Sequence, residues 1–223
     1  MENQIIVLYD WDGTLIDSLP AHIKFLREMN KRFKWGLDLP DPRDKGASKK
    51  IVGSPMKEFL INAGISPDVV PEIVRIYEKE FSDLKYHSEL FPGVPGMIRR
   101  FSEMSIPQGI LTSNYKKNMD RVLKKEGIYN LIYPVADKRE LDRFHDGKKA
   151  RWLEHHKIMN SFLKKEMIYV GDMKADYEES KKAEVSFIGA SHGWGFSPEE
   201  KTDFPLANSI GELEEAIMQF VKS

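Results

Sequence analysis

Short apolar runs rich in β-branched residues recur along the chain and are typical of buried strands. They lie at residues 5–9, 109–111, 131–135, 167–170 and 185–188. Between several of them, apolar residues recur at helical spacing, as at 98–104 and 119–123, and the last such pattern covers 210–220. Strands that alternate with helices predict a parallel sheet covered by helices on both faces, so we expect an α/β fold.

The alternation of strands and helices is interrupted once, between about residues 17 and 88. No strand pattern occurs there, whereas helical apolar spacing continues. The segment 91–96, Phe-Pro-Gly-Val-Pro-Gly, marks the return to the sheet, because two prolines and two glycines cannot continue a helix. These features predict an all-helical insertion at 17–88 in a core domain formed by residues 1–16 and 89–223.

Composition excludes several classes of protein. The chain has 223 residues, 41% of them hydrophobic and 31% charged, which is ordinary for a globular protein with a buried core. The net charge of −1 gives no reason to expect nucleic acid or an anionic membrane as a partner. Because no run approaches the roughly 20 apolar residues of a membrane span and no secretory leader precedes the first strand, we expect a cytoplasmic protein. The absence of cysteine excludes disulfides and thiolate chemistry.

The first apolar run leads directly into Asp10 and Asp12, two carboxylates at the carboxyl end of a predicted parallel strand. Ligands of open α/β sheets bind at this edge. One carboxylate could attack phosphorus while the other protonates the leaving oxygen. Gly13 permits a sharp turn, and the Thr14 hydroxyl could hold it. Read by itself, the motif is equally compatible with an ordinary turn after a strand.

Two further strands deliver polar residues to the same edge. Residues Thr112, Ser113 and Asn114 follow the second strand and could grip a phosphate, although such residues more often cap a helix. Asp172 and Asp176 follow the apolar run that ends at Val170, and paired carboxylates suit a hard cation such as Mg²⁺. Asp172 could instead cap the next helix.

The series Asp10-x-Asp12-Gly13-Thr14-Leu15, the polar residues at 112–114 and the acids at 172 and 176 together resemble the signatures of the haloacid dehalogenase-like superfamily. The resemblance is strongest to its phosphoglycolate phosphatase-like branch. It implies a Rossmann-like core with a helical cap at the position of the insertion. It also implies that Asp10 is the nucleophile and Asp12 the general acid/base.

The resemblance further implies a complete site. Mg²⁺ would be bound by the Asp10 side chain, the Asp12 main-chain carbonyl and the Asp172 side chain, with Asp176 in direct or water-mediated contact. The expected phosphate-binding residues are Gly13, Thr14, Ser113, Asn114 and Lys148. Thr112 is the alternative to Ser113, and Lys149 is the alternative to Lys148.

The function expected from these residues is hydrolysis of a small-molecule phosphate monoester, dependent on Mg²⁺ and passing through an aspartyl phosphate. Asp12 favours phosphate chemistry, because relatives that are dehalogenases lack an aspartate at that position. A sugar phosphomutase of the β-phosphoglucomutase kind would keep both aspartates and is the nearest alternative. A non-catalytic binding or regulatory module that retains the fold is the second alternative. The sequence has no histidine pair with metal-ligand spacing and no nucleotide-binding phosphate loop.

Overall fold

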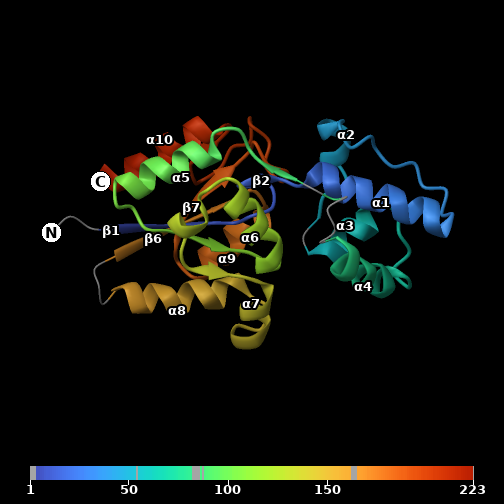
Figure 1. The fold of residues 1–223 in the computed structure, drawn as a ribbon, viewed down its shortest axis with the longest axis horizontal. Helices are drawn as coiled ribbons and strands as arrows, with labels where there is room; N and C mark the ends of the chain where they lie inside the picture. Colours follow the sequence, from blue (N-terminus) through green and yellow to red (C-terminus); the bar gives the residue numbers. More distant parts are fainter. Residues whose placement is uncertain (1–3, 54, 82–85, 87, 162–164, 223) are drawn as a thin grey trace. The chain divides into compact units, whose positions relative to one another are not determined.

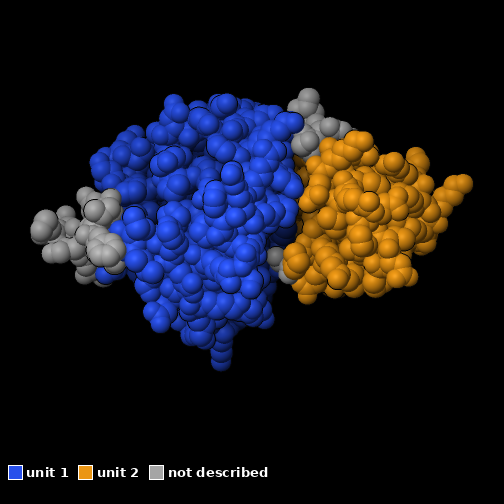
Figure 2. Space-filling model, turned by 90° about the horizontal axis from the view of Figure 1, so that it is seen from below, with its two compact units in different colours: residues 1–16, 90–223 blue, residues 17–89 orange. Residues whose placement is uncertain are grey.

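The computed structural model describes residues 4–53, 55–81, 86, 88–161 and 165–222. The chain divides into two compact units, which Figure 2 colours separately. Unit 1 combines residues 1–16 with 90–223, and unit 2 is the continuous segment 17–89.

Unit 1 is built around one parallel sheet (Figure 1). In the described residues its strands are β1 (Gln4–Tyr9), β4 (Gln108–Leu111), β5 (Val135–Ala136), β6 (Lys165–Gly171), β7 (Ser186–Ala190) and β8 (Leu206–Ala207). Their order is β5-β4-β1-β6-β7-β8, and every neighbouring pair is parallel. The α/β fold expected from the sequence is therefore confirmed.

Helices pack on both faces of this sheet, because the side chains of its strands alternate between the faces. Val7 and Tyr9 lie in a core cluster with helices α5 (Val94–Glu103), α6 (Lys116–Lys125) and α10 (Ile210–Lys222). Leu8 points the other way, into a second cluster formed with α7 (Lys138–Phe144), α8 (Lys149–Ser161) and the end of α9 (Lys174–Lys182). The two cores fix β1 in the middle of the sheet.

The expected strand at 131–135 is mostly wrong. A 3₁₀ turn occupies Tyr129–Leu131, and β5 contains only Val135–Ala136. Pro134 explains the late start, since proline has no N–H to donate to a ladder. Its carbonyl instead accepts a hydrogen bond from the Ile110 N–H at 2.9 Å. Strand β8 was not expected either, because two residues are too short to show a pattern.

Unit 2 contains helices α1 (Leu19–Phe33), α2 (Lys45–Lys49), α3 (Met56–Asn62) and α4 (Val70–Glu80). Aromatic rings form part of its core: His22 stacks on Phe81 with 4.6 Å between ring centroids, and Phe25 meets Tyr77 edge-on at 5.3 Å. The short strands β2 (Ile16–Asp17) and β3 (Glu89–Leu90) form a separate two-stranded sheet at the two points where the chain passes between the units.

Across the described residues, none of the helices combines the length and the apolar character that crossing a lipid bilayer requires.

Candidate active site

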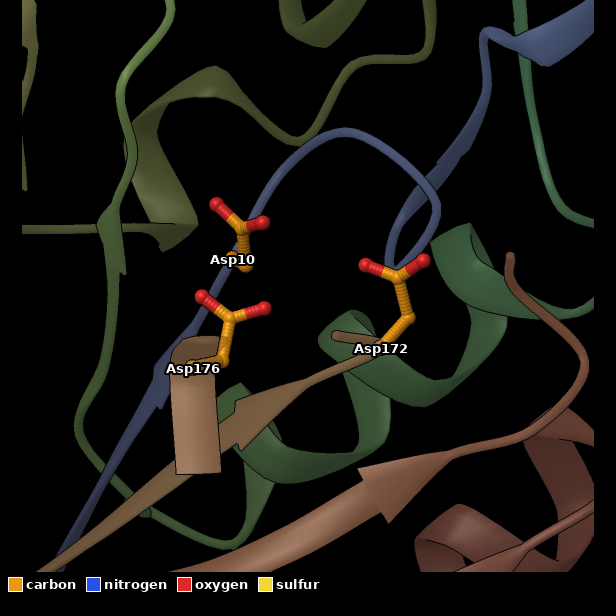
Figure 3. A group of neighbouring side chains, drawn as sticks. All are labelled: Asp10, Asp172 and Asp176. Atoms are coloured by element: carbon orange, nitrogen blue, oxygen red, sulfur yellow. The ribbon is translucent and has the colours of Figure 1, made fainter. Parts of the chain in front are cut away.

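The carboxylates expected at the sheet edge meet there because β1 and β6 are paired in register. Tyr9 lies opposite Val170, and the Asp10 N–H donates to the Val170 carbonyl at 2.8 Å. Asp172 follows β6, and Asp176 lies in the first turn of α9. Asp10, Asp172 and Asp176 are all buried, and each offers a carboxylate oxygen within 4.8 Å of the other two (Figure 3). Two distant segments of the chain, the end of β1 and residues 172–176, thus build one acidic cluster.

Burial makes negative charge on these carboxyl groups unfavourable, and their pKa values rise. Burial raises the pKa of Asp10 to about 7, against the opposing effect of Lys149 and helped by Asp176 and Asp12. Burial also raises the pKa of Asp172 well above its usual range, and Asp176 and Asp10 add to the effect. Crowded buried carboxylates are costly unless positive charge balances them. Their oxygens are the donors that Mg²⁺ prefers, so the residues present fit a divalent cation.

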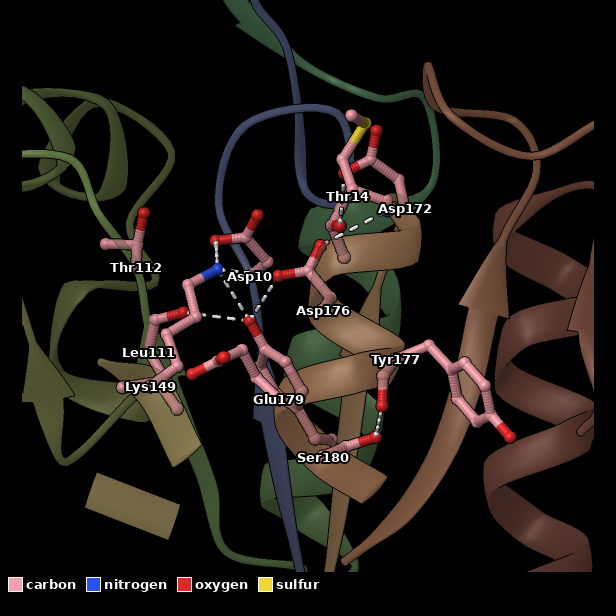
Figure 4. Close-up of polar contacts among 12 residues, drawn as sticks. Asp10, Thr14, Leu111, Thr112, Lys149, Asp172, Asp176, Tyr177, Glu179 and Ser180 are labelled. Atoms are coloured by element: carbon pink, nitrogen blue, oxygen red, sulfur yellow. Dashed lines mark hydrogen bonds and ion pairs between the residues drawn. The ribbon is translucent and has the colours of Figure 1, made fainter. Parts of the chain in front are cut away.

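Lys149 supplies one such positive charge. Its ammonium lies 2.9 Å from Asp10 Oδ1 and 2.7 Å from Asp176 Oδ1 (Figure 4). Burial alone would lower the pKa of Lys149, but the two carboxylates hold it above the ordinary value.

The lysine that contacts the cluster is Lys149, the alternative, and not Lys148, the residue first expected there. Lys148 is exposed, whereas Lys149 is buried as the first residue of α8. The reason is local: Asp146 and Gly147 adopt positive φ, and the Lys148 N–H closes a turn onto the His145 carbonyl. The chain then enters α8 with the side chain of Lys149 directed at the carboxylates.

Asp12 is held by Asn114. The Asn114 Nδ2 donates to Asp12 Oδ2 at 2.8 Å. The amide oxygen of Asn114 is hydrogen-bonded as well: it accepts from the Tyr115 N–H at 2.7 Å and from Asn118 Nδ2 at 3.0 Å. These contacts fix which way the amide faces. The side chain of Asn114 thus links the loop after β4 to the loop after β1, and its expected phosphate contact stays a prediction.

The two candidate hydroxyls after β4 differ in burial. Thr112 is only 1% exposed, and its Oγ1 accepts from the Asn114 N–H at 3.1 Å. Ser113, the residue expected in the site, is exposed. Thr112, which directly follows β4 and is drawn beside Lys149 in Figure 4, is therefore the better candidate for a hydroxyl of the site.

Gly13 and Thr14 bring the β1 loop against Asp172. Gly13 has a φ of +77°, and a Cβ at this position would lie 2.2 Å from Asp172 Oδ2. The Thr14 hydroxyl donates to Asp172 Oδ1 at 3.4 Å. This hydroxyl therefore serves Asp172, and the expected contacts of Gly13 and Thr14 with a phosphate stay predictions.

Sequence reasoning missed the loop at 192–195 and the side chain of Tyr169. The Trp194 N–H donates to Asp172 Oδ2 at 2.8 Å, and a Cβ on Gly193 would lie 2.2 Å from the Gly13 carbonyl oxygen. The alternating glycines at 193 and 195 were the available signal for a close approach. For Tyr169 the signal was a hydroxyl inside an otherwise apolar strand, which needs a buried partner.

Residues 7–190 match the family model described as haloacid dehalogenase-like hydrolase. A phosphoglycolate phosphatase of Synechococcus elongatus is 26% identical over 215 residues, which are 96% of this chain and 96% of that protein.

Solved structures agree on the fold. A haloacid dehalogenase-like hydrolase from Streptococcus pneumoniae superimposes with a TM-score of 0.76 at 20% identity, over 99% of this chain and 100% of that one. A predicted phosphatase from Clostridium acetobutylicum gives a TM-score of 0.72 at 20% identity, over 97% of this chain and 99% of that one. Because the family model spans most of the chain, and covers both segments that build the carboxylate cluster, this protein belongs to the haloacid dehalogenase-like hydrolases.

Proposed function

We propose that this protein is a Mg²⁺-dependent phosphatase that hydrolyses a small-molecule phosphate monoester through an aspartyl phosphate on Asp10. The observation that carries the proposal is the buried group of Asp10, Lys149, Asp172 and Asp176 at the carboxyl edge of the sheet. Curated relatives support the same chemistry, since those from Synechococcus elongatus and Vibrio vulnificus are named phosphoglycolate phosphatase.

The proposed cation ligands are the side chains of Asp10 and Asp172 and the main-chain carbonyl of Asp12. Asp176 is less available, because its Oδ1 is already paired with the Lys149 ammonium and its Oδ2 accepts from the Met173 N–H at 3.2 Å. Both oxygens of Asp172 accept from neutral donors, the Thr14 hydroxyl and the Trp194 N–H. We therefore assign Asp176 a role beside the ion. When bound, Mg²⁺ would offset negative charge between the carboxylates and a substrate phosphate.

Asp10 and Asp12 divide the chemical work between them. An oxygen of Asp10 attacks phosphorus, the bond from phosphorus to the leaving oxygen breaks, and Asp12 gives that oxygen a proton. In the second half, Asp12 takes a proton from a water molecule whose oxygen attacks the same phosphorus. The bond to Asp10 then breaks, which releases inorganic phosphate, returns Asp10 to a carboxylate and leaves Asp12 protonated for the next turnover.

Other residues prepare this reaction. Lys149 contacts Oδ1 of Asp10, which leaves Oδ2 as the attacking atom and places positive charge beside it. Asn114 holds Asp12 through its amide, so the acid/base is oriented before substrate binds. We propose Thr112, in place of Ser113, as the hydroxyl that donates to the phosphate.

The proposal is tested by measuring phosphate release from a chromogenic aryl phosphate and a panel of small phosphate esters, beginning with 2-phosphoglycolate. Asp10→Asn should abolish turnover, because an amide is a poor nucleophile, while leaving the fold intact. Asp142→Asn is the matched control: it lies on α7, its side chain is about half exposed, and its ion pair with Lys138 is on the surface.

Three outcomes are informative. Phosphate release that requires Asp10 supports the proposal. Isomerisation of a sugar phosphate without net release would instead identify a mutase. A folded wild-type protein that turns over nothing in the panel would favour the binding module and contradict the proposed activity.

A further inference from the structure

The hydroxyl of Tyr169 is the third oxygen around the Lys149 ammonium. It lies 2.7 Å from Lys149 Nζ, as close as the nearer carboxylate. Tyr169 comes from the middle of β6 and is fully buried, on the face of the sheet that α8 and α9 cover. Figure 4 shows the Lys149 ammonium directed at Asp10 and Asp176.

The hydrogen bonds at this point can be fully assigned. An ammonium has three N–H donors and no acceptor, and three oxygens surround it: Asp10 Oδ1, Asp176 Oδ1 and the Tyr169 hydroxyl. The Tyr169 oxygen must therefore accept from Lys149 and direct its own hydrogen elsewhere. Asp176 Oδ1 is 3.0 Å away, and the Leu111 carbonyl at 3.4 Å is the weaker alternative. Every donor of the lysine thus has a partner.

We propose that Tyr169 is a positioning residue that holds the Lys149 ammonium beside Asp10, an inference that rests on the proposed function. Lysine ends in a flexible chain, so its charge is useful only where the surroundings fix it. Asp10 is an unreliable anchor, because its carboxylate loses its charge when it becomes an aspartyl phosphate. The Tyr169 hydroxyl is neutral throughout, and with Asp176 it keeps the lysine in place at both half-reactions.

Packing alone does not account for a tyrosine at this position. Its neighbours in the strand, Ile168 and Val170, are apolar and buried, and a phenylalanine would fill the same space. A buried hydroxyl costs free energy unless it is hydrogen-bonded, so its presence here points to its contacts. Tyr169→Phe removes these contacts and keeps the ring, whose centroid lies 5.5 Å from the ammonium.

The first test compares Tyr169→Phe with Tyr9→Phe as a matched control. Tyr9 is equally buried, lies in the neighbouring strand β1, and donates its hydroxyl to Gln108 Oε1 at 3.2 Å on the opposite face of the sheet. Because a hydrogen bond to a charged group is strong, we expect kcat of Tyr169→Phe to fall roughly tenfold to a hundredfold, with little change in KM. Tyr9→Phe should keep the wild-type kcat.

A double-mutant cycle separates positioning from general destabilisation. In a Lys149→Met background there is no ammonium to place, so adding Tyr169→Phe should cause no further loss of kcat. If Tyr169→Phe lowered the residual activity of Lys149→Met by the same factor as it lowers that of wild type, the inference would be overturned.

A second readout does not depend on activity. With ¹⁵N-labelled lysine, the buried Lys149 ammonium should give an NMR signal protected from exchange, assigned by its loss in Lys149→Met. Tyr169→Phe should shift this signal or speed its exchange with water, and Tyr9→Phe should leave it unchanged. If the wild-type protein releases no phosphate, the proposed function fails and this comparison alone decides the inference. An unaltered Lys149 signal in Tyr169→Phe would overturn it.

Discussion

At the scale of single residues, Lys148 and Lys149 differ in burial: Lys148 is exposed and Lys149 is buried. The two side chains are chemically identical and adjacent, but only Lys149 reaches Asp10 and Asp176. Removing the charge that offsets a reacting phosphate typically costs roughly 10²–10³ in kcat. We expect a loss of that order for Lys149→Met and a wild-type rate for Lys148→Met, measured as phosphate release. Equal rates for the two variants would remove Lys149 from the mechanism.

Thr112 and Ser113 form a second adjacent pair with opposite burial. If the Thr112 hydroxyl donates to the substrate phosphate, Thr112→Val should lower kcat/KM roughly tenfold to a hundredfold, because it keeps the shape and loses the hydrogen bond. Ser113→Ala, at an exposed position, should have little effect. The reverse order, with Ser113→Ala the damaging change, would restore Ser113 as the phosphate ligand. Steady-state kinetics with one aryl phosphate decide between them.

Both pairs show which features of the site could be predicted from the sequence and which could not. The strand ends were readable from apolar runs, so the residues that follow β1, β4 and β6 could be placed at one edge of the sheet. Whether Thr112 or Ser113 is buried depends on where β4 ends, and whether Lys148 or Lys149 is buried depends on where α8 begins. Those bounds follow from packing and turn geometry, which a pattern of residue types does not encode. Tyr169 escaped notice for a related reason, since its partner Lys149 lies 20 positions away in the chain.

At the scale of elements, the site depends on how closely three loops approach one another. Gly193 in the loop after β7 faces the β1 loop and Asp172, and a Cβ there would lie 2.2 Å from the Gly13 carbonyl oxygen and 2.5 Å from Asp172 Cβ. These contacts are far below van der Waals distance, so a methyl group must push the loops apart.

We therefore expect Gly193→Ala to lower the free energy of unfolding by roughly 1–3 kcal/mol, the usual effect of overpacking, and to reduce activity by displacing Asp172. Gly211→Ala in α10 is the control, because its added Cβ would meet only Ser209 Oγ at 3.8 Å. Alanine also favours the helix there. Urea unfolding of both variants checks the prediction, and a Gly193→Ala protein as stable as Gly211→Ala would contradict it.

The elements that sequence missed are the short ones. The central strands β1 and β6 have long apolar runs and were predicted to within two residues at either end. Strands β5 and β8 have two residues each, and both follow a proline, at 134 and 205. These short strands are stabilised by pairing with β4 and β7, and two residues are too few to show a strand pattern in the sequence.

At the scale of the whole molecule, the order of the motifs carries more information than any one of them. Each motif is short and has an ordinary structural explanation, but all follow strands β1, β4 and β6, which are adjacent in the sheet. The helical segment 17–88 interrupts the core between the first motif and the second. Its role as a cap that sets substrate specificity stays a prediction, to be examined by substrate profiles of variants in unit 2.

The metal requirement is a property of this assembled site. EDTA should stop phosphate release and Mg²⁺ should restore it, because the buried carboxylates need a balancing cation. Asp172→Ala should raise the Mg²⁺ concentration needed for activity far more than Asp176→Ala, whose main loss should be in kcat through Lys149. Mg²⁺ should also raise the melting temperature of the wild-type protein, an effect that Asp172→Ala abolishes. Unchanged Mg²⁺ dependence in Asp172→Ala, with its loss in Asp176→Ala, would reverse the ligand assignment.

The central claim is that phosphate passes through a covalent bond to Asp10. The most direct measurement is to quench the enzyme during turnover, reduce it with borohydride and map the peptides by mass spectrometry, since borohydride converts an acyl phosphate to an alcohol. The account predicts homoserine at position 10 when substrate and Mg²⁺ are both present, and unmodified aspartate at Asp12, Asp172 and Asp176. Homoserine at another aspartate, or none at position 10 in an enzyme trapped while it turns over, would contradict the account.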